Sequence, residues 1–461
     1  MNKKLNSIKI AYIGGGSRDW AWDLMNDLAL SKKISGQVAL YDIDFEAAKH
    51  NEIIGNRICN DNPQAAKWEY KAEETIEKAL AGADIVVISI LPGTFDEMES
   101  DLHTPEKYGI YQSVGDTVGP GGIIRALRTV PMYVTIAEAI RDNCPEAWVI
   151  NYTNPMSICV RTLYKVFPKI KAFGCCHEVF STQRLLAQAL ADVKGIKDVD
   201  RHEIITNVYG INHFTWIDSA RYNDIDLFPV YAEYIRGVEE GKYDCYFDCG
   251  AGELVFNSHE MVKMDLFKRY GIIAAAGDRH LAEFCPIEWY MRDKQQVEDF
   301  GYALTPISWR RENLKFRLQK SKRLYTGEEK LKIKESGEEG VQQIEAILGC
   351  GDMITNVNLP NMGQIPNLPL DAVVETNAVF RNDSVRPVMA GKLPDELYAL
   401  TAPIVAEQEM LVEAGINKDL ELAFRAFSCS NHMPLSIKQS RELFDEMVNN
   451  TKKYLDGYKL P

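Results

Sequence analysis

The sequence predicts an α/β protein with a doubly wound parallel sheet and a second, mixed α/β domain. Two observations point to this fold. The first 150 residues alternate between apolar strand-like runs and segments with helical spacing, and glycines follow the first strand. Such alternation, with strands that are apolar throughout, is typical of a parallel sheet covered by helices on both faces.

The expected strands of this first part are short and nearly all apolar, as strands buried on both faces should be. They lie at residues 8–13, 38–41, 85–91 and 148–152. The segments between them repeat apolar residues three and four apart, which predicts amphipathic helices. These lie at residues 20–30, 46–56, 74–80 and 123–140.

After residue 200 the pattern is mixed. Residues 204–211 predict a strand, residues 315–334 are lysine-rich and should be solvated, and residues 394–427 return to helical periodicity. The chain has no internal repeat and no low-complexity linker. At 461 residues it exceeds the usual size of one domain, so two closely packed domains are expected.

The composition limits the partners. The formal net charge is −14, which argues against nucleic acid and against an anionic membrane surface, since both need clustered Lys and Arg. No stretch approaches the ~20 apolar residues of a membrane span, and no signal-peptide core precedes the first strand. The ten cysteines are sparse and expected as thiols. We therefore expect a cytoplasmic protein.

A nucleotide-binding turn is predicted at the end of the first strand. It contains four small residues, Gly14, Gly15, Gly16 and Ser17. They would let the backbone approach a pyrophosphate at the start of the following helix, although Asp19 stands where a third motif glycine belongs. Asp42 ends the second strand, where a carboxylate can bind ribose hydroxyls, so NAD is favoured over NADP. A plain tight turn is the alternative.

A pair of soft-metal ligands follows in the middle of the chain. Cys176 and His177 come after a predicted strand at residues 172–175, and His213 comes after another strand. The carboxyl ends of strands are where open α/β sheets build their sites. One thiolate and one imidazole leave positions on an ion for substrate oxygens, as a catalytic metal requires. The alternative is that each side chain is simply packed in the core.

Two further segments carry polar groups suited to a sugar. Asn151 and Asn154 close a strand with amides that can bind hydroxyls, and helix capping is the alternative for Asn154. Asp278, Arg279 and His280 gather an acid, a cation and an imidazole in one turn. This density suits acid and base chemistry, with a surface ion-pair cluster as the alternative.

Three other groups carry weaker signals. Asp116 lies in a glycine-rich loop, residues 115–122, where a turn role is expected. Arg125 and Arg128 lie on the following helix, as surface charges or as anion clamps. Cys245 and Cys249 are spaced like half of a zinc site, but no second pair accompanies them, so zinc binding is not expected.

Together these residues resemble glycoside hydrolase family 4, whose glycosidases depend on NAD and a metal ion. The resemblance covers nearly the whole chain. It includes the glycine turn, Asn-Tyr-Thr-Asn-Pro at 151–155, Cys-His at 176–177, Gly-Ile-Asn-His at 210–213, and the segment Asn-Val-Asn-Leu-Pro-Asn through Pro-Asn-Leu-Pro at 356–369. The run Cys-His-Glu-Val at 176–179 looks like the α-galacturonidase branch, which acts on uronic-acid glycosides.

The resemblance implies a Rossmann domain like that of lactate and malate dehydrogenases, for which we predict residues 1–200 as the NAD-binding part. Residues 201–461 would then form the α/β domain for substrate, metal and oligomerisation. It also implies a homodimer or a homotetramer. Cys176 and His213 would bind a divalent ion, usually Mn²⁺, with Ni²⁺ or Co²⁺ as alternatives.

The resemblance also implies roles for other residues. His177 would be the acid, Asp278 the base with His280 in reserve, and Asp101 a carboxylate that tunes the base. Substrate contacts would come from Asn154, Asn151 and Arg279. For a galacturonide, one of Arg125, Arg128 or Arg279 should hold the C6 carboxylate.

The implied reaction is an oxidation of the sugar at C3 by NAD, removal of the C2 proton, elimination of the aglycone, addition of water and return of the hydride. Net hydrolysis results. The alternatives are a 6-phospho-α-glucosidase or an α-glucosidase of the same family, a 2-hydroxy-acid dehydrogenase, and an NAD-sensing regulator without catalysis.

Overall fold

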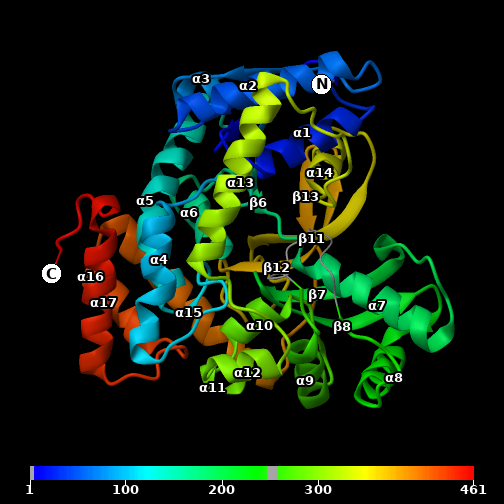
Figure 1. Ribbon diagram of the computed structural model, residues 1–461, viewed down its shortest axis with the longest axis vertical. Coiled ribbons are helices and arrows are strands. Elements are labelled where there is room, and N and C mark those ends of the chain that lie inside the picture. Colours follow the sequence, from blue (N-terminus) through cyan, green and yellow to red (C-terminus); the bar gives the residue numbers. More distant parts are fainter. Residues whose placement is uncertain (1–4, 247–256, 461) are drawn as a thin grey trace.

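In the computed structural model, which describes residues 5–246 and 257–460, one sheet of nine strands crosses the molecule (Figure 1). Its order is β13-β12-β11-β6-β5-β4-β1-β2-β3. The strands are β1 (Ile8–Ile13), β2 (Gly36–Tyr41), β3 (Trp68–Ala72), β4 (Ile85–Ile88), β5 (Trp148–Asn151), β6 (Lys171–Gly174), β11 (Met353–Pro360), β12 (Val373–Arg381) and β13 (Ser384–Pro387).

The six strands from β3 to β6 are parallel and follow the doubly wound order 3-2-1-4-5-6. This confirms the predicted fold class. Strands β11, β12 and β13 were not predicted. They extend the sheet antiparallel beyond β6, through the single pair Asn358 and Gly174. The predicted boundary at residue 200 stays a prediction, but residues 353–387 complete the sheet of the first part.

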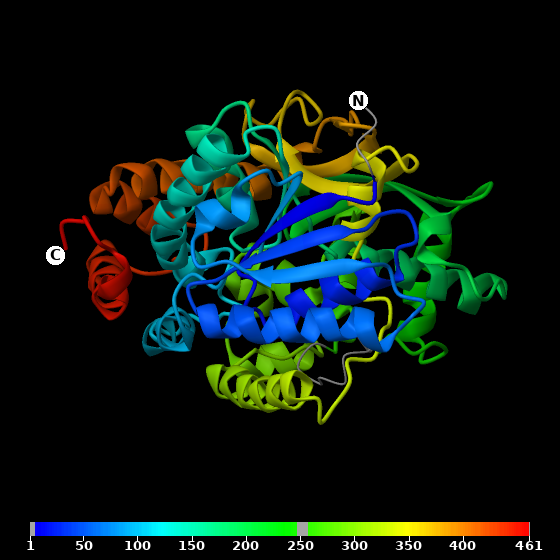
Figure 2. The ribbon, with the colours of Figure 1, turned by 90° about the horizontal axis from the view of Figure 1, so that it is seen from above.

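Helices cover both faces of this sheet, as Figure 2 shows. One face packs against α1 (Trp20–Leu30), α2 (Phe45–Asp61) and α14 (Gly340–Ile347). The other packs against α3 (Ile76–Leu80), α5 (Gly119–Asn143) and α6 (Met156–Val166). Burial on both sides explains why the strands are apolar at nearly every position.

A second, antiparallel sheet lies beside the first. It contains β7 (Ile204–Ile211), β8 (Phe214–Tyr222), β9 (Ile225–Asp226) and β10 (Ile273–Ala274). Its core is shared with α7 (Glu178–Lys194) and α8 (Leu227–Glu239). The predicted strand at residues 204–211 is confirmed as β7.

The described residues contain further helices. They are α4 (Phe95–His103), α9 (Met261–Tyr270), α10 (Asp278–Phe284), α11 (Ile287–Tyr290), α12 (Lys294–Asp299), α13 (Ile307–Thr326), α15 (Asp395–Asn417), α16 (Leu420–Cys429) and α17 (Ile437–Thr451). The last three form the orange-to-red group in Figure 1, beside α4 and α5. Helix α13 buries Ile307, Ser321 and Leu324, and its other residues are partly or fully exposed, in agreement with the solvated segment predicted at residues 315–334.

Candidate active site

The glycine turn after β1 is tightly enclosed. Gly14 has φ +94°, and a Cβ there would lie 2.0 Å from the carbonyl oxygen of Ser89. A Cβ on Gly16 would lie 2.7 Å from the Cβ of Ala47. The turn therefore requires glycine at both positions, since it passes between β4 and α2 with no room for side chains.

Asp42 lies at the end of β2, beside this turn. Its Oδ2 accepts a hydrogen bond from the backbone N–H of Gly16 at 2.9 Å, and its Oδ1 accepts from that of Asp44 at 2.9 Å. Burial raises the pKa of Asp42, although the two N–H donors oppose it. Each carboxylate oxygen has a second lone pair, so both can also accept from ribose hydroxyls.

Cys176 lies in the turn that follows the carboxyl end of β6 and precedes α7. The backbone N–H of Glu178 and the side chain of Asn212 hydrogen-bond to its thiol. Burial and the nearby Glu375 carboxyl raise the pKa of this thiol. A bound cation would reverse that effect, because metal coordination favours the thiolate.

His213 is delivered to the same place by a two-residue hairpin between β7 and β8. Ile211 pairs with Phe214, so Asn212 and His213 form the connection, and His213 takes φ +65°. A positive φ is costly for a residue other than glycine and is usually found where function requires it. The strained backbone of His213 is therefore consistent with a functional role for its imidazole.

The imidazole of His213 stacks on that of His280, with ring centroids 3.7 Å apart. Its Nδ1 lies 3.2 Å from the hydroxyl of Thr117. Burial and the neighbouring His280 lower the pKa of His213 to about 3, and burial also lowers the pKa of His280. Both rings are therefore neutral at pH 7, and a neutral imidazole is the form that binds metal or accepts a proton.

Two carboxylates complete the cluster. Burial alone would raise the pKa of Asp116, but Arg125 and the two histidines outweigh it and lower the pKa to about 2. In the same way, His280 and His177 outweigh burial at Glu178 and lower its pKa to about 2. Glu178 Oε2 accepts from the backbone N–H of Gly277 at 2.7 Å.

His177 faces a different side, towards α14. Its Nδ1 lies 2.7 Å from Oε1 of Glu338. Burial would lower the pKa of His177, but Glu338 raises it to about 9. The side chain is 49% exposed, so the ring is both charged and accessible at pH 7.

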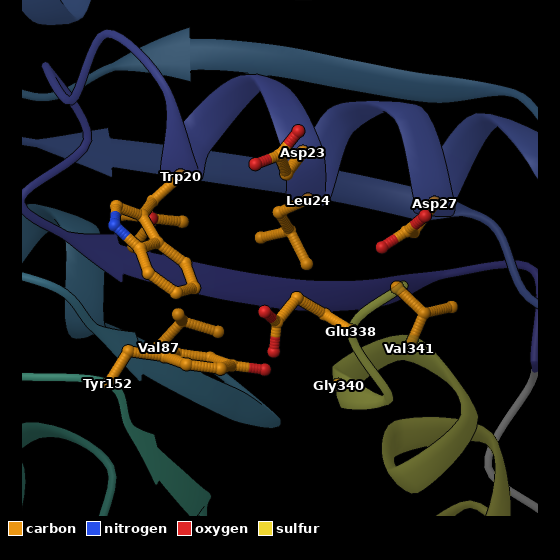
Figure 3. Close-up of a pocket in the computed structure, with 10 residues that line it drawn as sticks. Trp20, Asp23, Leu24, Asp27, Val87, Tyr152, Glu338, Gly340 and Val341 are labelled. Atoms are coloured by element: carbon orange, nitrogen blue, oxygen red, sulfur yellow. The ribbon is translucent and has the colours of Figure 1, made fainter. Parts of the chain in front are cut away.

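A small cavity adjoins this ion pair, between α1 and the start of α14 (Figure 3). Trp20 lines it and stacks on His177, with ring centroids 6.1 Å apart. Three carboxylates also line it, those of Asp23, Asp27 and Glu338. Burial and the neighbouring acids raise the pKa of Asp23 to about 6.

Asp278 does not join the cluster around His213. Its two oxygens accept from the backbone N–H groups of Val262 and Lys263, at 3.0 and 3.1 Å, and so cap the first turn of α9. Burial and the nearby Glu260 raise the pKa of Asp278 to about 7. Of the two bases proposed from the sequence, His280 is the one that lies against His213.

The two asparagines at the end of β5 have different surroundings. Asn151 is buried, and its amide is used by the hydroxyl of Tyr133 and by the backbone of Thr153. Asn154 precedes a cis proline, and its Oδ1 is buried without a hydrogen-bond partner among residues 5–246 and 257–460. Asn154 is therefore the better placed of the two to accept from a substrate hydroxyl.

Asp101 and Arg128 form a buried ion pair. The guanidinium meets the carboxylate in two hydrogen bonds of 3.1 and 2.5 Å, and both side chains are almost completely buried. Arg128 also donates to Thr451 Oγ1 and to the carbonyl oxygen of Pro92. This pairing removes Arg128 from the arginines that can hold a substrate anion.

Four residues near the cluster were not proposed from the sequence. They are Glu178, Arg310, Glu338 and Glu375. Glu178 adjoins the Cys-His pair and had a local signal. The other three lie in segments far along the chain, and only the fold brings them here.

The spacing of Cys245 and Cys249, from which no zinc site was expected, cannot be compared with the structure, because Cys249 lies outside the described residues. Among the residues that are described, no group of three or more His, Cys, Asp or Glu side chains is arranged to hold a metal ion. A two-ligand site with open positions does not require such a group. In the same residues, no helix is both long and apolar enough to cross a bilayer.

The fold and this site define a class of protein: a Rossmann-type enzyme whose reactive cluster lies at the sheet edge that carries its nucleotide turn. Residues 9–192 match the Family 4 glycosyl hydrolase domain, and residues 208–433 match the Family 4 glycosyl hydrolase C-terminal domain. The chain belongs to glycoside hydrolase family 4.

Close relatives cover almost the entire chain. It is 60% identical to an α-galacturonidase of Thermoanaerobacterium saccharolyticum, over 99% of this chain and 98% of that one. It is 51% identical to an α-galacturonidase of Bacillus subtilis, over 96% and 97%. An α-galactosidase of Bacillus subtilis is 28% identical, over 98% and 100%.

Solved structures share the fold. The crystal structure of the Bacillus subtilis protein lplD has a TM-score of 0.90 at 51% identity, over 96% of this chain and 100% of that one. The 6-phospho-β-glucosidase of Thermotoga maritima, crystallised with manganese, NAD⁺ and glucose-6-phosphate, has a TM-score of 0.76 at 20% identity, over 97% and 99%. This second similarity concerns the fold alone.

Proposed function

We propose that this protein is an α-galacturonidase that hydrolyses uronic-acid α-glycosides and depends on NAD and a divalent metal ion. The observation that carries the proposal is the identity of 51–60% to four proteins named α-galacturonidase, over 96–99% of this chain. Relatives with other sugar specificities are at 26–28% identity.

The nucleotide turn fits NAD. Its glycines leave no room for side chains, and Asp42 offers two half-buried carboxylate oxygens beside them. The next residue, Ile43, is 94% exposed, which suits a position that an adenine ring would cover. An acidic residue at the end of β2 would repel the 2′-phosphate of NADP.

The cluster at Cys176 and His213 fits a divalent ion such as Mn²⁺. The donors are a thiol and a neutral imidazole, and Asn212 links them because it follows β7 directly and bonds to the thiol. The Oδ1 of Asn212 is buried and has no hydrogen-bond partner within the described part of the chain. A cation or a substrate hydroxyl would satisfy this oxygen.

When bound, NAD and the ion supply a reversible hydride acceptor and a Lewis acid at the sugar. The side chains of the protein must then donate and accept the protons of the reaction. His177 is charged and half-exposed, so it can deliver a proton to the glycosidic oxygen of the leaving group. Glu338 holds the ring from its Nδ1 side, and Nε2, which lies 3.9 Å from Oε1 of Glu178, would make that transfer.

His280 is the best-placed acceptor for the C2 proton. Its ring is neutral, its Nδ1 is buried without a partner in the described residues, and Glu178 lies 3.7 Å from its Nε2. Glu178 would stabilise the imidazolium that forms. Asp278, whose oxygens cap α9, then has a structural role.

The test is a release assay on nitrophenyl α-galacturonide with NAD, Mn²⁺ and a reductant, each omitted in turn. Release that needs every component, with deuterium from the solvent appearing at C2 of the released galacturonate, supports the proposal. Release that persists without NAD would contradict it. Stoichiometric accumulation of NADH with a 2-hydroxy acid would instead indicate a dehydrogenase.

The localisation and the oligomeric state of the protein are part of the same proposal. The nine cysteines in the described residues are free, and an NAD-dependent reaction suits the reducing, NAD-rich cytoplasm. A homodimer or a homotetramer is the assembly we expect. Sedimentation analysis of the purified protein would decide between these two states.

A further inference from the structure

Three arginines from separate helices meet at the loop that carries Asp116. Arg125 lies on α5, Arg279 on α10 and Arg310 on the first turn of α13. The charges that act most strongly on the Arg310 guanidinium are those of Asp116, Arg279 and Arg125. Arg310 precedes the lysine-rich stretch of residues 315–334.

Backbone contacts bring the three helices to this loop. The backbone N–H of Thr305, just before α13, donates to the carbonyl oxygen of Ser113 at 2.9 Å. The Ser113 hydroxyl in turn donates to the carbonyl oxygen of Arg279. Arg125 Nε donates to the carbonyl oxygen of Asn154 at 3.1 Å, so Arg125 lies beside the residue proposed to contact the sugar.

Two acids among the described residues lie near Arg310. Among the described residues, Asp116 is the acid that acts most strongly on the Arg310 guanidinium, and Arg125 acts on Asp116 in turn. The next acid, Glu283, has its Oε1 occupied by the backbone N–H groups of Val114 and Gly115, and burial raises its pKa to about 7. Within the described residues, the charge of the Arg310 guanidinium is therefore opposed by the ionised Asp116 and only partly by Glu283.

Arg310 also has an unsatisfied donor. Its Nε is buried and has no hydrogen-bond partner in residues 5–246 and 257–460. A buried guanidinium N–H without a partner is costly, and an anionic ligand would satisfy it. Planar guanidinium groups bind carboxylates in two parallel hydrogen bonds, which suits a uronic acid.

We propose that Arg310 determines specificity, because together with Arg125 and Arg279 it binds the C6 carboxylate of the substrate. This inference rests on the proposed function. It assigns recognition of the uronic acid to a helix outside the metal cluster. An α-galactoside has an uncharged hydroxyl at C6, which cannot form the paired, charge-assisted hydrogen bonds that a carboxylate forms with a guanidinium.

The test compares Arg310→Gln with Arg311→Gln. Arg311 is the next residue on α13, but it is half-exposed and pairs with Asp96 and Glu99. Calorimetric titration measures galacturonate binding to each variant loaded with NAD and Mn²⁺. We expect Arg310→Gln to raise the Kd for galacturonate about 10- to 100-fold, because this is the contribution that a hydrogen bond to a charged group makes to binding. Arg311→Gln should leave it within twofold.

Further measurements separate the possible explanations of a change in Kd. The Kd for NAD and the thermal midpoint of Arg310→Gln should stay at wild-type values, and a parallel loss of both would mean that Arg310 only supports the fold. An unchanged Kd for galacturonate would overturn the inference. Tighter binding of galactose 6-phosphate than of galacturonate to the wild type would assign the pocket to a phosphate instead. Failure of the wild type to cleave the galacturonide would refute the proposed function itself.

Discussion

Replacing Asp101 tests whether this carboxylate acts in the reaction or in the fold. The resemblance to the family predicts a role in tuning the base, whereas the structure pairs it with Arg128 in a fully buried, bidentate contact. Asp101→Asn would leave the Arg128 charge buried without its counter-ion. Breaking a buried pair in this way costs about 3–5 kcal/mol of unfolding free energy.

That cost converts into a measurable shift. An unfolding entropy of about 2.1 cal/mol/K per residue gives about 1 kcal/mol/K for 461 residues that unfold together. The thermal midpoint of Asp101→Asn should therefore fall by about 3–5 °C. The variant Asp101→Leu combined with Arg128→Met should recover most of this loss, because it removes both charges.

The control is Asp96→Asn, on the same helix α4. Asp96 is 75% exposed and pairs with Arg311 at the surface, so its loss should cost under about 1 kcal/mol. Differential scanning calorimetry gives the midpoints, and the release assay at 25 °C gives kcat for the folded protein. A midpoint within 1 °C of wild type, as an order-of-magnitude threshold, with kcat reduced about 100-fold, would refute the structural role and restore Asp101 to the reaction.

Three further predictions concern separate sites. Asp42→Ala should raise the Kd for NAD about 10- to 100-fold, measured by quenching of protein fluorescence, while Glu46→Gln on the exposed side of α2 should leave it unchanged; equal effects would contradict the ribose contact. Asp23→Asn should raise the unfolding free energy at pH 7.5 by about 1–2 kcal/mol after allowance for its partial exposure, because the native pKa of about 6 lies above the unfolded value and makes ionisation costly. In urea unfolding this gain should shrink as the pH falls from 6 to 4, and a gain that is the same at both ends would count against it. Cys176→Ser should weaken Mn²⁺ binding by more than about 100-fold in an electron paramagnetic resonance titration, and Cys175→Ser, whose thiol bonds to Gln343, should not.

Local elements could be predicted where one stretch of chain contains the whole signal. β1 and α1 begin and end at the predicted residues, since an apolar run and a helical repeat are both visible within about a dozen residues. Strands β11 to β13 escaped prediction because their place in the sheet depends on pairing with β6, which lies about 180 residues earlier.

The candidate site shows the same division. Cys176 and His213 could be chosen from the sequence because both follow strands, and parallel topology brings strand ends together. Asp278 and His280 are neighbours in sequence, but successive positions on a helix point in different directions. Asp278 therefore caps α9 while His280 stacks on His213. Which of the two faces the cluster depends on the packing of α10, which no local pattern reports.

The antiparallel neighbour of β6 has a consequence for the order in which the enzyme is made. Glu375 on β12 binds the side-chain amides of Asn356 and Asn212, and Asn212 in turn bonds to the thiol of Cys176. A nascent chain that has emerged only as far as residue 200 would have β6 as an open edge, which is a site for aggregation. The contacts of Glu375 with Asn356 and Asn212 can form only after residue 375 has been synthesised, so the thiol of Cys176 gains its final surroundings late in synthesis.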